Sequence, residues 1–512
     1  MLVISNNKKI AKNTIFLYIR MILVMAVSLY TSRVNLNVLG VVDNGIYQVV
    51  GGIVALFSFL SNSLSGATSR FLTYEIGKDD KIKLKETFSA VFIVHCVLAI
   101  IIVILSEVIG AWFLYNKLNI PAERFHAAAI AFQFSVISSI FSITQVPYNA
   151  SIIAHERMSI YAYMSILDVC LRLVVCLLLY FSPYDKLVTF SILTLTVSIF
   201  IQIIYRLYCI KNFEECRFQR NNNISIIKPI LFFSGWDLFG NFSVMARTQG
   251  VNMILNIFFG PVINSAVGFS ATIGNTILSF SNNFNAAIRP PIIKAYASGD
   301  IKRMQELMIN ASKISFFLLL LLSAPFLFES EYIIKLWLKT PPPYTYMFCK
   351  YELTFSIITS LFLPLVYAIH ATGKVKFMSI VNGSIWFFTV PITYILLKLG
   401  FSPFVPYITK IGLLFFVIVS NIYSVQKYIK EFRYKEYLKL SFIPAVKVLI
   451  FSSIPLLIIY YQLLDLTAIY RLIIICISSC IIISGCSYFF LISSKDRKDL
   501  IFKIKLKLHY EK

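Results

Sequence analysis

Long apolar runs alternate with short polar and basic breaks along almost the whole chain. A helix needs about 20 apolar residues to cross a bilayer, and most runs reach that length. The pattern predicts fourteen membrane-spanning helices, near residues 14–32, 45–68, 87–113, 122–146, 160–181, 186–209, 229–257, 262–284, 307–328, 353–371, 376–398, 404–426, 442–463 and 468–492. The first run follows a polar and basic segment, so we expect a retained helix rather than a cleaved signal.

The composition excludes a soluble globular chain. Hydrophobic residues make up 58% and charged residues only 14% of the 512 residues, whereas soluble domains carry roughly 25% charge. The mean hydropathy is +0.77. The nine cysteines fall mostly inside apolar runs, and none has metal-ligand spacing with histidine. We therefore expect an all-α integral membrane protein with no disulfide framework, no metal and no cofactor.

The placement of the basic residues predicts a topology. A formal charge of +23 would suit a nucleic-acid-binding protein, but the charges are not spread at random. Of the 47 lysines and arginines, 32 lie on or near the side that holds both termini and only nine on or near the opposite side. Because loops rich in lysine and arginine stay in the cytoplasm, both termini are predicted to be cytoplasmic. The charge then faces an anionic leaflet, and no nucleic-acid partner is expected.

An internal repeat occurs at an offset of 220 residues. The identical positions are Gly40, Val42, Asn44, Ile53, Ser61, Asn62 and Ala67, which recur as Gly260, Val262, Asn264, Ile273, Ser281, Asn282 and Ala287. The repeat pairs the second span with the eighth, so both copies have the same orientation in the membrane. We therefore predict a six-helix lobe over residues 1–215, a second such lobe over 216–440, and two further helices with a basic tail over 441–512.

The predicted eighth span carries a polar stripe on one helix face. Its members are Asn264, Gly268, Ala271, Asn275, Ser279, Asn282, Ala286 and Arg289. The asparagines and the arginine exceed what helix packing needs, which predicts a stripe that lines a wet cavity. The second span carries a weaker counterpart, formed by Gly51, Ala55, Ser58, Asn62, Ser65 and Ser69. For the second span we favour close helix packing through small residues.

Three basic residues inside predicted spans have no obvious acidic neighbour in their own helices: Arg20, Arg247 and Lys410. A cation at the middle of a membrane costs roughly 2.5–3.5 kcal/mol on insertion scales, so these side chains should face an interior cavity. Few acids lie at depth, namely Asp168, Asp237 and Glu107. The predicted cavity is therefore net positive and suits an anion, because the planar fork of arginine matches phosphate oxygens.

Two of these acids have further interpretations. Asp168 and Arg172 are four residues apart in the fifth span, which is the spacing of an intrahelical ion pair, and a structural pair is the favoured interpretation. Asp237 is a candidate coupling carboxylate, because an acid in a mostly cationic cavity can exchange a proton. It is equally a candidate for pairing with a nearby cation, and the sequence leaves both interpretations open.

Neither an ATPase nor an enzyme is indicated. No G-x-x-x-x-G-K-[ST] phosphate loop occurs, and no predicted cytoplasmic loop is long enough for an ATPase domain. Transport would therefore be driven by a gradient or by the downhill flux of the substrate. The longest predicted external loop, about Glu329–Glu352, is small for a catalytic domain.

Four segments carry a resemblance to a known family. They are Leu39-Gly40 with Gly45-Ile46-Tyr47-Gln48-Val49-Val50-Gly51-Gly52; Ala67-Thr68-Ser69-Arg70-Phe71-Leu72 with Glu75 and Gly77; Pro147-Tyr148-Asn149-Ala150 with Ala154, Glu156, Met158 and Tyr161; and Gly235-Trp236, Gln249-Gly250-Val251-Asn252, Asn256, Phe258-Phe259-Gly260-Pro261 and Asn264, continuing to Lys294-Ala295-Tyr296-Ala297-Ser298-Gly299-Asp300. They cover much of residues 30–310, and the rest matches mainly in hydropathy. In these segments the chain resembles the polysaccharide-transporter (Wzx-type) O-antigen flippases of the multidrug/oligosaccharidyl-lipid/polysaccharide exporter superfamily.

The resemblance implies a V-shaped fold of two lobes in the bacterial inner membrane. It also implies flipping of an undecaprenyl-pyrophosphate-linked oligosaccharide from the cytoplasmic to the periplasmic leaflet. The implied partners are this lipid-linked glycan, the bilayer, and the polymerase and ligase machinery of polysaccharide assembly. Related lipid II flippases use cationic residues of the first span in a central cavity, and Arg20 has a comparable place. A groove formed by the last two spans would fit the lipid tail.

We expect alternating access around a cationic cavity. Arg20 and Arg247 would neutralise the pyrophosphate, with Lys410 as a weaker candidate. The expected partners of the sugar hydroxyls are Asn252, Asn275 and Asn282.

Two rival functions remain open. A drug or cation antiporter of the same fold would favour a cavity rich in acids and aromatic rings, whereas this sequence offers arginine and asparagine. A membrane glycan polymerase or ligase would need a sizeable external loop with catalytic side chains and would not predict the 220-residue repeat. A scaffold that transports nothing leaves the buried cations unexplained.

Overall fold

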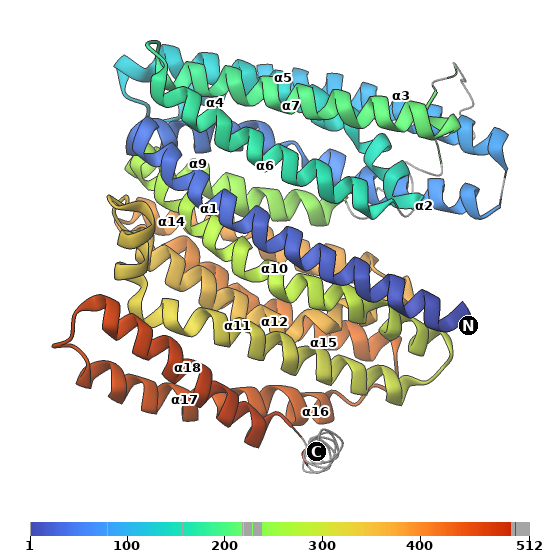
Figure 1. The fold of residues 1–512 in the computed structure, drawn as a ribbon, viewed down its shortest axis with the longest axis vertical. Coiled ribbons are helices and arrows are strands. Elements are labelled where there is room, and N and C mark those ends of the chain that lie inside the picture. The colour runs from blue at the N-terminus through green and yellow to red at the C-terminus, as the bar shows by residue number, and fades with distance from the viewer. Residues whose placement is uncertain are drawn as a thin grey trace. The chain divides into compact units, whose positions relative to one another are not determined.

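The computed structural model describes residues 2–78, 80–155, 157–217, 219, 228, 238–492 and 497, and these residues form helices joined by short turns (Figure 1). The helices are α1 (Leu2–Leu56), α2 (Phe59–Gly77), α3 (Lys81–Leu105), α4 (Ala111–Asn116), α5 (Phe125–Ala154), α6 (Met158–Phe181), α7 (Lys186–Asn212), α9 (Val251–Phe259), α10 (Pro261–Ala297), α11 (Ile301–Leu338), α12 (Thr345–Thr372), α13 (Lys376–Phe387), α14 (Thr389–Lys398), α15 (Val405–Tyr428), α16 (Tyr434–Tyr437), α17 (Ile443–Gln462) and α18 (Ala468–Phe490). Residues 238–245 are also helical and continue into α9 through a π-helical turn, Ala246–Gly250.

The helices have the lengths and compositions of membrane spans. Within the described residues, eleven helical segments are long and apolar enough to cross a bilayer, so the prediction of an all-α integral membrane protein is confirmed. The predicted second and eighth spans correspond to α1–α2 and to α10, the helices that carry the polar stripes. Part of the predicted seventh span, near 229–257, lies outside the described residues.

Two glycines end a helix in the same unusual backbone conformation. Gly40 has φ 76° and ψ 173°, and Gly260 has φ 75° and ψ −175°. Only glycine adopts this region readily, because a Cβ would clash there. The two residues are 220 positions apart, so the repeat seen in the sequence is also a repeat of backbone geometry. The break between the first two spans therefore lies at Gly40, and the loop expected across residues 33–44 is wrong, because the chain stays helical on both sides of it.

The same offset relates the helices that follow. Asp80 caps α3 by accepting a hydrogen bond from the Lys83 N–H at 3.0 Å, and Asp300 caps α11 by accepting from the Arg303 N–H at 2.9 Å. Such caps satisfy amide groups that the first turn of a helix leaves without partners. α3 and α11 begin at residues 81 and 301, and α5 and α12 begin at 125 and 345. The repeat therefore includes the helices that follow the repeated glycine.

The starts of the two repeated helices approach each other closely. A Cβ added to Gly45 would lie 1.7 Å from the Pro261 carbonyl oxygen, and a Cβ added to Gly268 would lie 2.7 Å from Gln48 Cδ. Gln48 and Gly268 are themselves 220 positions apart, as expected where two copies of a repeat meet near a pseudo-twofold axis. The Ser265 hydroxyl donates to Asn44 Oδ1 at 3.1 Å across the same contact. Small residues permit this approach, as is common between membrane helices.

The chain packs into two compact units. Unit 1 comprises Met1–Phe269, Thr340–Tyr344 and Asn382–Pro406, and unit 2 comprises Ser270–Lys339, Thr345–Val381 and Tyr407–Lys512. These units follow packing within the chain, whereas the lobes at 1–215, 216–440 and 441–512 were defined by the repeat, and those boundaries stay a prediction.

Unit 1 is built around α5, which packs against α2, α3 and α7 (Figure 1). Its core contains the fully buried side chains of Phe88, Phe132 and Leu179. Tyr148 packs edge-on against Phe88, with the ring centroids 5.3 Å apart. Since lipid is as apolar as these side chains, close packing rather than exclusion of water holds such helices together within the membrane.

Unit 2 contains two helix pairs, α11 with α12 and α17 with α18, and α18 also packs on α11. The buried Tyr437 of α16 joins these elements. Its hydroxyl lies 2.7 Å from Ser312 Oγ of α11 and donates to the Leu361 carbonyl of α12 at 2.8 Å. The short α16 is thereby held against both helices, which positions the start of α17.

The long external loop predicted near Glu329–Glu352 is mostly helical, so its predicted length is wrong. α11 continues to Leu338, and α12 begins at Thr345. Glu352 lies within α12, whereas Glu329 lies at a break in α11, with φ −109° and ψ 30°. Both acids pair with cations from distant parts of the chain. Glu329 binds Arg471 of α18, with Arg471 Nη2 donating to Glu329 Oε2 at 3.1 Å. Because each charge is neutralised, the helices extend beyond their apolar runs.

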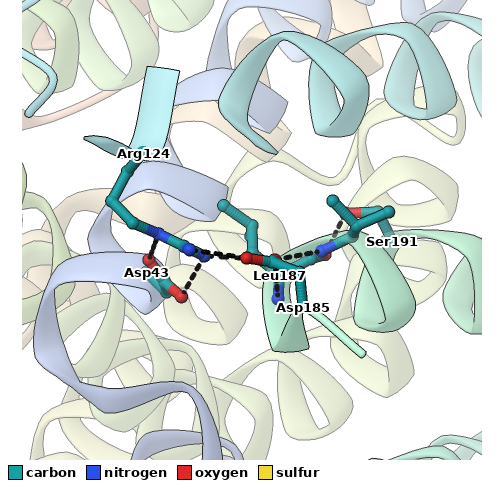
Figure 2. Close-up of polar contacts among 6 residues, drawn as sticks. Asp43, Arg124, Asp185, Leu187 and Ser191 are labelled. Carbon is teal, nitrogen blue, oxygen red and sulfur yellow. Dashed lines mark hydrogen bonds and ion pairs between the residues drawn. The ribbon is translucent and has the colours of Figure 1, made fainter. Parts of the chain in front are cut away.

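Three helix starts of unit 1 meet at Arg124 (Figure 2). Arg124 Nε and Nη2 donate to the two carboxylate oxygens of Asp43 at 2.8 and 2.6 Å. Arg124 Nη1 and Nη2 donate to Asp185 at 2.5 and 3.1 Å. Asp185 Oδ1 also caps α7 by accepting from the Leu187 and Val188 N–H groups at 3.0 and 3.1 Å. This arrangement, called here the Arg124 cluster, joins α1, α5 and α7.

We expect Gly45→Ala to lower the melting temperature of the purified protein strongly. Its Cβ would overlap a backbone oxygen, and overpacking of this kind costs about 1–3 kcal/mol or more. The matched control is Gly412→Ala in α15, where an added Cβ meets nothing within 4 Å. Equal melting temperatures for the two variants would contradict the close approach at Pro261.

The Arg124 cluster predicts a pH-dependent stability. Hydrogen bonding to Arg124 lowers the pKa of Asp185 below its usual range, and the Val188 N–H acts in the same direction. A lowered pKa in the folded state contributes stability above the unfolded value of about 3.9, and this contribution is lost as the pH falls through the folded pKa. Asp185→Asn should therefore reduce thermal stability at pH 7, and its difference from wild type should shrink toward pH 3. A pH-independent difference would contradict this assignment.

Candidate functional site

A cavity of about 370 Å³ lies inside unit 1, between α1, α2, α3, α5 and α7. Four residues of the second-span stripe line it: Gly51, Ala55, Ser58 and Asn62. The stripe predicted to serve close helix packing therefore also forms a cavity wall at these four positions. The same segment also makes packing contacts, since Ser58 Oγ lies 3.6 Å from Met245 Sδ. Phe59 packs against Phe242 with ring centroids 5.1 Å apart.

The opposite wall of the cavity is a row of hydroxyls on α5, formed by Ser135, Ser138, Ser139 and Ser142. Their spacing of three and four residues places them on one helix face. Ser135 donates to the Ala131 carbonyl at 2.9 Å. The hydroxyls of Ser139 and Ser142 likewise donate to their own helix. This row was not predicted from the sequence, although serines spaced three and four residues apart within an apolar run indicate a polar helix face.

Arg247 is not among the residues that line this cavity and lies in the π-helical turn Ala246–Gly250. Its guanidinium carbon is 4.1 Å from the centroid of the Trp386 ring of α13. A cation at this distance is attracted by the face of the ring, so the indole positions the guanidinium. Isolated π-helical turns are frequent at functional sites, because they shift the side chains that follow. Arg247 is thus a positioned and half-buried cation.

Asn252 belongs to a buried asparagine network near Gly260. Asn264 Nδ2 donates to both the backbone oxygen and Oδ1 of Asn252 at 2.7 Å. Asn256 Nδ2 donates to Asn264 Oδ1 at 2.8 Å, and Asn256 Oδ1 accepts from the Asn119 N–H at 2.8 Å. The network connects α9, α10 and the turn before α5, so Asn252 is occupied within the protein.

Asn275 and Asn282 lie on the part of α10 that belongs to unit 2, and both are exposed. The predicted stripe is therefore divided: Asn264 and Gly268 at its start are packed within unit 1, whereas these two amides are accessible. Arg20 lies in α1, but its side chain is outside the described structure, and Asp237 is outside the described residues. The predicted contacts of Arg20 and Asp237 stay predictions.

Lys410 has an acidic partner that a search within its own helix could not find. Its Nζ lies 2.8 Å from both carboxylate oxygens of Glu352 on α12 and 3.9 Å from the centroid of the Phe355 ring. Gly274 of α10 leaves the space that Glu352 occupies, because a Cβ there would lie 2.7 Å from Glu352 Cγ. Counting Lys410 as an uncompensated charge is therefore wrong. This region of unit 2 is less cationic than predicted.

The remaining charged pair of the prediction lies on α6. Arg172 Nε donates to Asp168 Oδ2 at 3.0 Å, one helical turn apart. Both side chains are partly exposed, at 43% and 28%, which limits the contribution of the pair to stability. Within the described residues, no group of three or more His, Cys, Asp or Glu side chains could hold a metal ion.

Comparison with known proteins gives matches at the level of structure. No protein-family model matches the chain, and no curated protein matches its sequence. The lipid II flippase MurJ in an inward closed conformation matches with a TM-score of 0.67 at 14% identity, over 96% of this chain and 100% of that one. An outward-facing multidrug resistance MATE family transporter of the MOP superfamily matches with a TM-score of 0.58 at 16% identity, over 81% and 95%. A MATE structure in complex with MaL6 matches with a TM-score of 0.58 at 16% identity, over 81% and 94%.

At such identities the likeness concerns the fold. The chain is a multi-pass membrane protein with the fold of MOP-superfamily transporters and flippases. The likeness therefore confirms the fold expected in the sequence analysis. The narrower assignment to O-antigen flippases stays a prediction.

We expect Glu352→Gln to destabilise the protein because it leaves the Lys410 ammonium, only 16% exposed, without its counter-charge. The double variant Glu352→Gln/Lys410→Met should recover much of the lost melting temperature. Glu331→Gln is the matched control, since Glu331 pairs with Lys335 at an exposed site where an ion pair contributes about 0–1 kcal/mol. A double variant no more stable than Glu352→Gln would show that the two charges are not coupled.

Proposed function

We propose that this protein is a flippase that moves an undecaprenyl-pyrophosphate-linked oligosaccharide from the cytoplasmic to the periplasmic leaflet of a bacterial inner membrane. The glycan would serve the assembly of a surface polysaccharide such as O-antigen, capsule or exopolysaccharide. Both termini would be cytoplasmic, and the periplasmic product would pass to polymerase or ligase machinery. The flippase would work by alternating access and would not itself be an enzyme.

The observation that carries the proposal is the extent of the fold match. A lipid II flippase matches 96% of this chain over its whole length, whereas the MATE transporters match 81%. The structure of the lipid II flippase therefore matches a part of this chain that the MATE transporters do not match. This favours a lipid-linked substrate over a soluble drug or cation.

Arg247 is the best supported phosphate ligand of the proposal. A guanidinium binds phosphate oxygens through two parallel hydrogen bonds, and stacking on Trp386 at 4.1 Å limits the rotamer entropy lost when it does so. Arg20 would be its partner on α1. Lys410 is a weaker candidate because Glu352 already binds it at 2.8 Å.

The sugar ligands proposed on α10 are Asn275 and Asn282, whose amides are accessible. Asn252 is a weaker candidate because Asn264 occupies its oxygens. Asp237 keeps both of its proposed roles, as a coupling carboxylate or as the partner of a cation. The Asp168–Arg172 pair is proposed to be structural.

The deciding experiment locates the lipid-linked glycan in the host. A deletion strain, the intact strain and Arg247→Ala would be compared with a membrane-impermeant sugar-oxidising probe. We expect completed glycan to be trapped on the cytoplasmic side in the deletion strain. Arg247→Ala should transport roughly tenfold less, because a hydrogen bond to a charged group contributes about 1.5–3 kcal/mol.

Arg303→Ala is the control variant, since Arg303 is an exposed arginine that pairs with Glu306 at the start of α11. It should transport as the intact protein does. Single repeat units accumulating on the periplasmic side of the deletion strain would instead indicate a polymerase or ligase. Unchanged glycan together with a new sensitivity to cationic drugs would indicate an antiporter.

A further inference from the structure

The cavity of unit 1 presents mainly hydrogen-bond acceptors. Ser58 donates its hydroxyl proton to the Ala55 carbonyl at 2.7 Å, and Ser191 donates to the Leu187 carbonyl at 2.8 Å. Three serines of the α5 row do the same within their helix. A hydroxyl carries one donor and two acceptor sites. Each of these serines has therefore used its donor and keeps lone pairs for the cavity.

Three lining groups have no partner among the described residues. Ser61 is 7% exposed and lines the cavity, yet its hydroxyl makes no hydrogen bond. The hydroxyl of Ser138 and the side-chain amide of Asn62 are equally without partners in the described structure. The Ser61 side chain is otherwise buried, so the cavity is where its hydroxyl can find a hydrogen-bond partner,. The missing partner of Ser61 therefore points to a polar ligand.

The lining is also neutral. Among the described residues it contains no Asp, Glu, Lys, Arg or His side chain, and the rings of Tyr47 and Phe134 complete it. Such a cavity cannot compensate the charge of a pyrophosphate or of an organic cation. Its volume of about 370 Å³ lies at the low end of the roughly 300–1,000 Å³ found for small-molecule sites, which suits one sugar rather than a whole repeat unit.

We propose that this cavity is a subsite for one uncharged sugar of the transported glycan. The inference rests on the flippase function proposed above. The hydroxyls of a sugar supply the donors that the serine oxygens lack, and its apolar C–H face packs on an aromatic ring. Asn62 and Ser138 supply the few donors that a ring oxygen or an acetamido carbonyl needs. The subsite rejects acidic sugars, since no cation lines it.

The test measures the binding of two lipids to the full-length protein in nanodiscs. One probe is undecaprenyl pyrophosphate that carries the repeat unit extracted from the host deletion strain, and the other is undecaprenyl pyrophosphate alone. Thr194→Leu and Ser138→Leu fill the cavity. Thr196→Leu is the matched control on α7, because Thr196 is exposed and lies outside the cavity lining.

We expect both cavity variants to lose roughly tenfold or more in affinity for the glycan-bearing lipid, as when a site cannot pair its polar groups, and to bind the bare lipid as wild type does. Thr196→Leu should change neither affinity. Ser61→Ala, which leaves the packing intact, should show a smaller loss confined to the glycan-bearing lipid. Ser61→Ala therefore still tests the subsite if a leucine variant fails to fold.

If the cavity variants bind the glycan-bearing lipid as tightly as the wild-type protein does, the subsite proposal is overturned. The flippase proposal is not affected by that result. An equal loss for both lipids would also overturn it, because the cavity would then act on the lipid rather than on the sugar. A wild-type protein that binds neither lipid would sink the flippase proposal itself, and the subsite with it.

Discussion

The backbone contact between the starts of the two repeated helices constrains much of unit 1. Gly40 and Gly260 turn the chain in a conformation that other residues avoid,. The helical segments that follow these two turns pack closely against each other. Gly45 fits there only because it has no side chain. The asparagine network around Asn264 then satisfies the polar groups that this turn buries, which water cannot do inside a membrane.

Charge is distributed differently in the two units. In unit 2, Lys410 and Arg471 are each bound by a glutamate from another helix, so these cations hold helices together. In unit 1, Arg247 stacks on Trp386, and an aromatic face attracts a cation without neutralising it. The described lining of the unit 1 cavity is uncharged, so the positive cavity inferred from the sequence stays a prediction.

Much of the helical architecture could be predicted from hydropathy, because apolar runs must form helices in a membrane. The repeat was visible as well, since Gly40 and Gly260 are retained for a backbone conformation. Hydropathy placed the ends of α11 and α12 wrongly, because Glu329 and Glu352 look like loop residues until their distant partners are known. The role of Ser58 and Asn62 was only partly predicted for a similar reason, since small polar residues suit both close packing and the wall of a cavity. Only the three-dimensional arrangement shows which neighbour faces them.

The Arg124 cluster shows a chemical difference between the two copies of the repeat. Its members Asp43, Arg124 and Asp185 correspond, 220 positions later, to Ile263, Tyr344 and Val405. Tyr344 packs edge-on against Phe404 with ring centroids 5.5 Å apart, so an ionic junction in one copy is replaced by an apolar one in the other. Salt screens the first and strengthens the second. The two copies of the repeat therefore respond to salt in opposite directions at equivalent positions, and neither could replace the other.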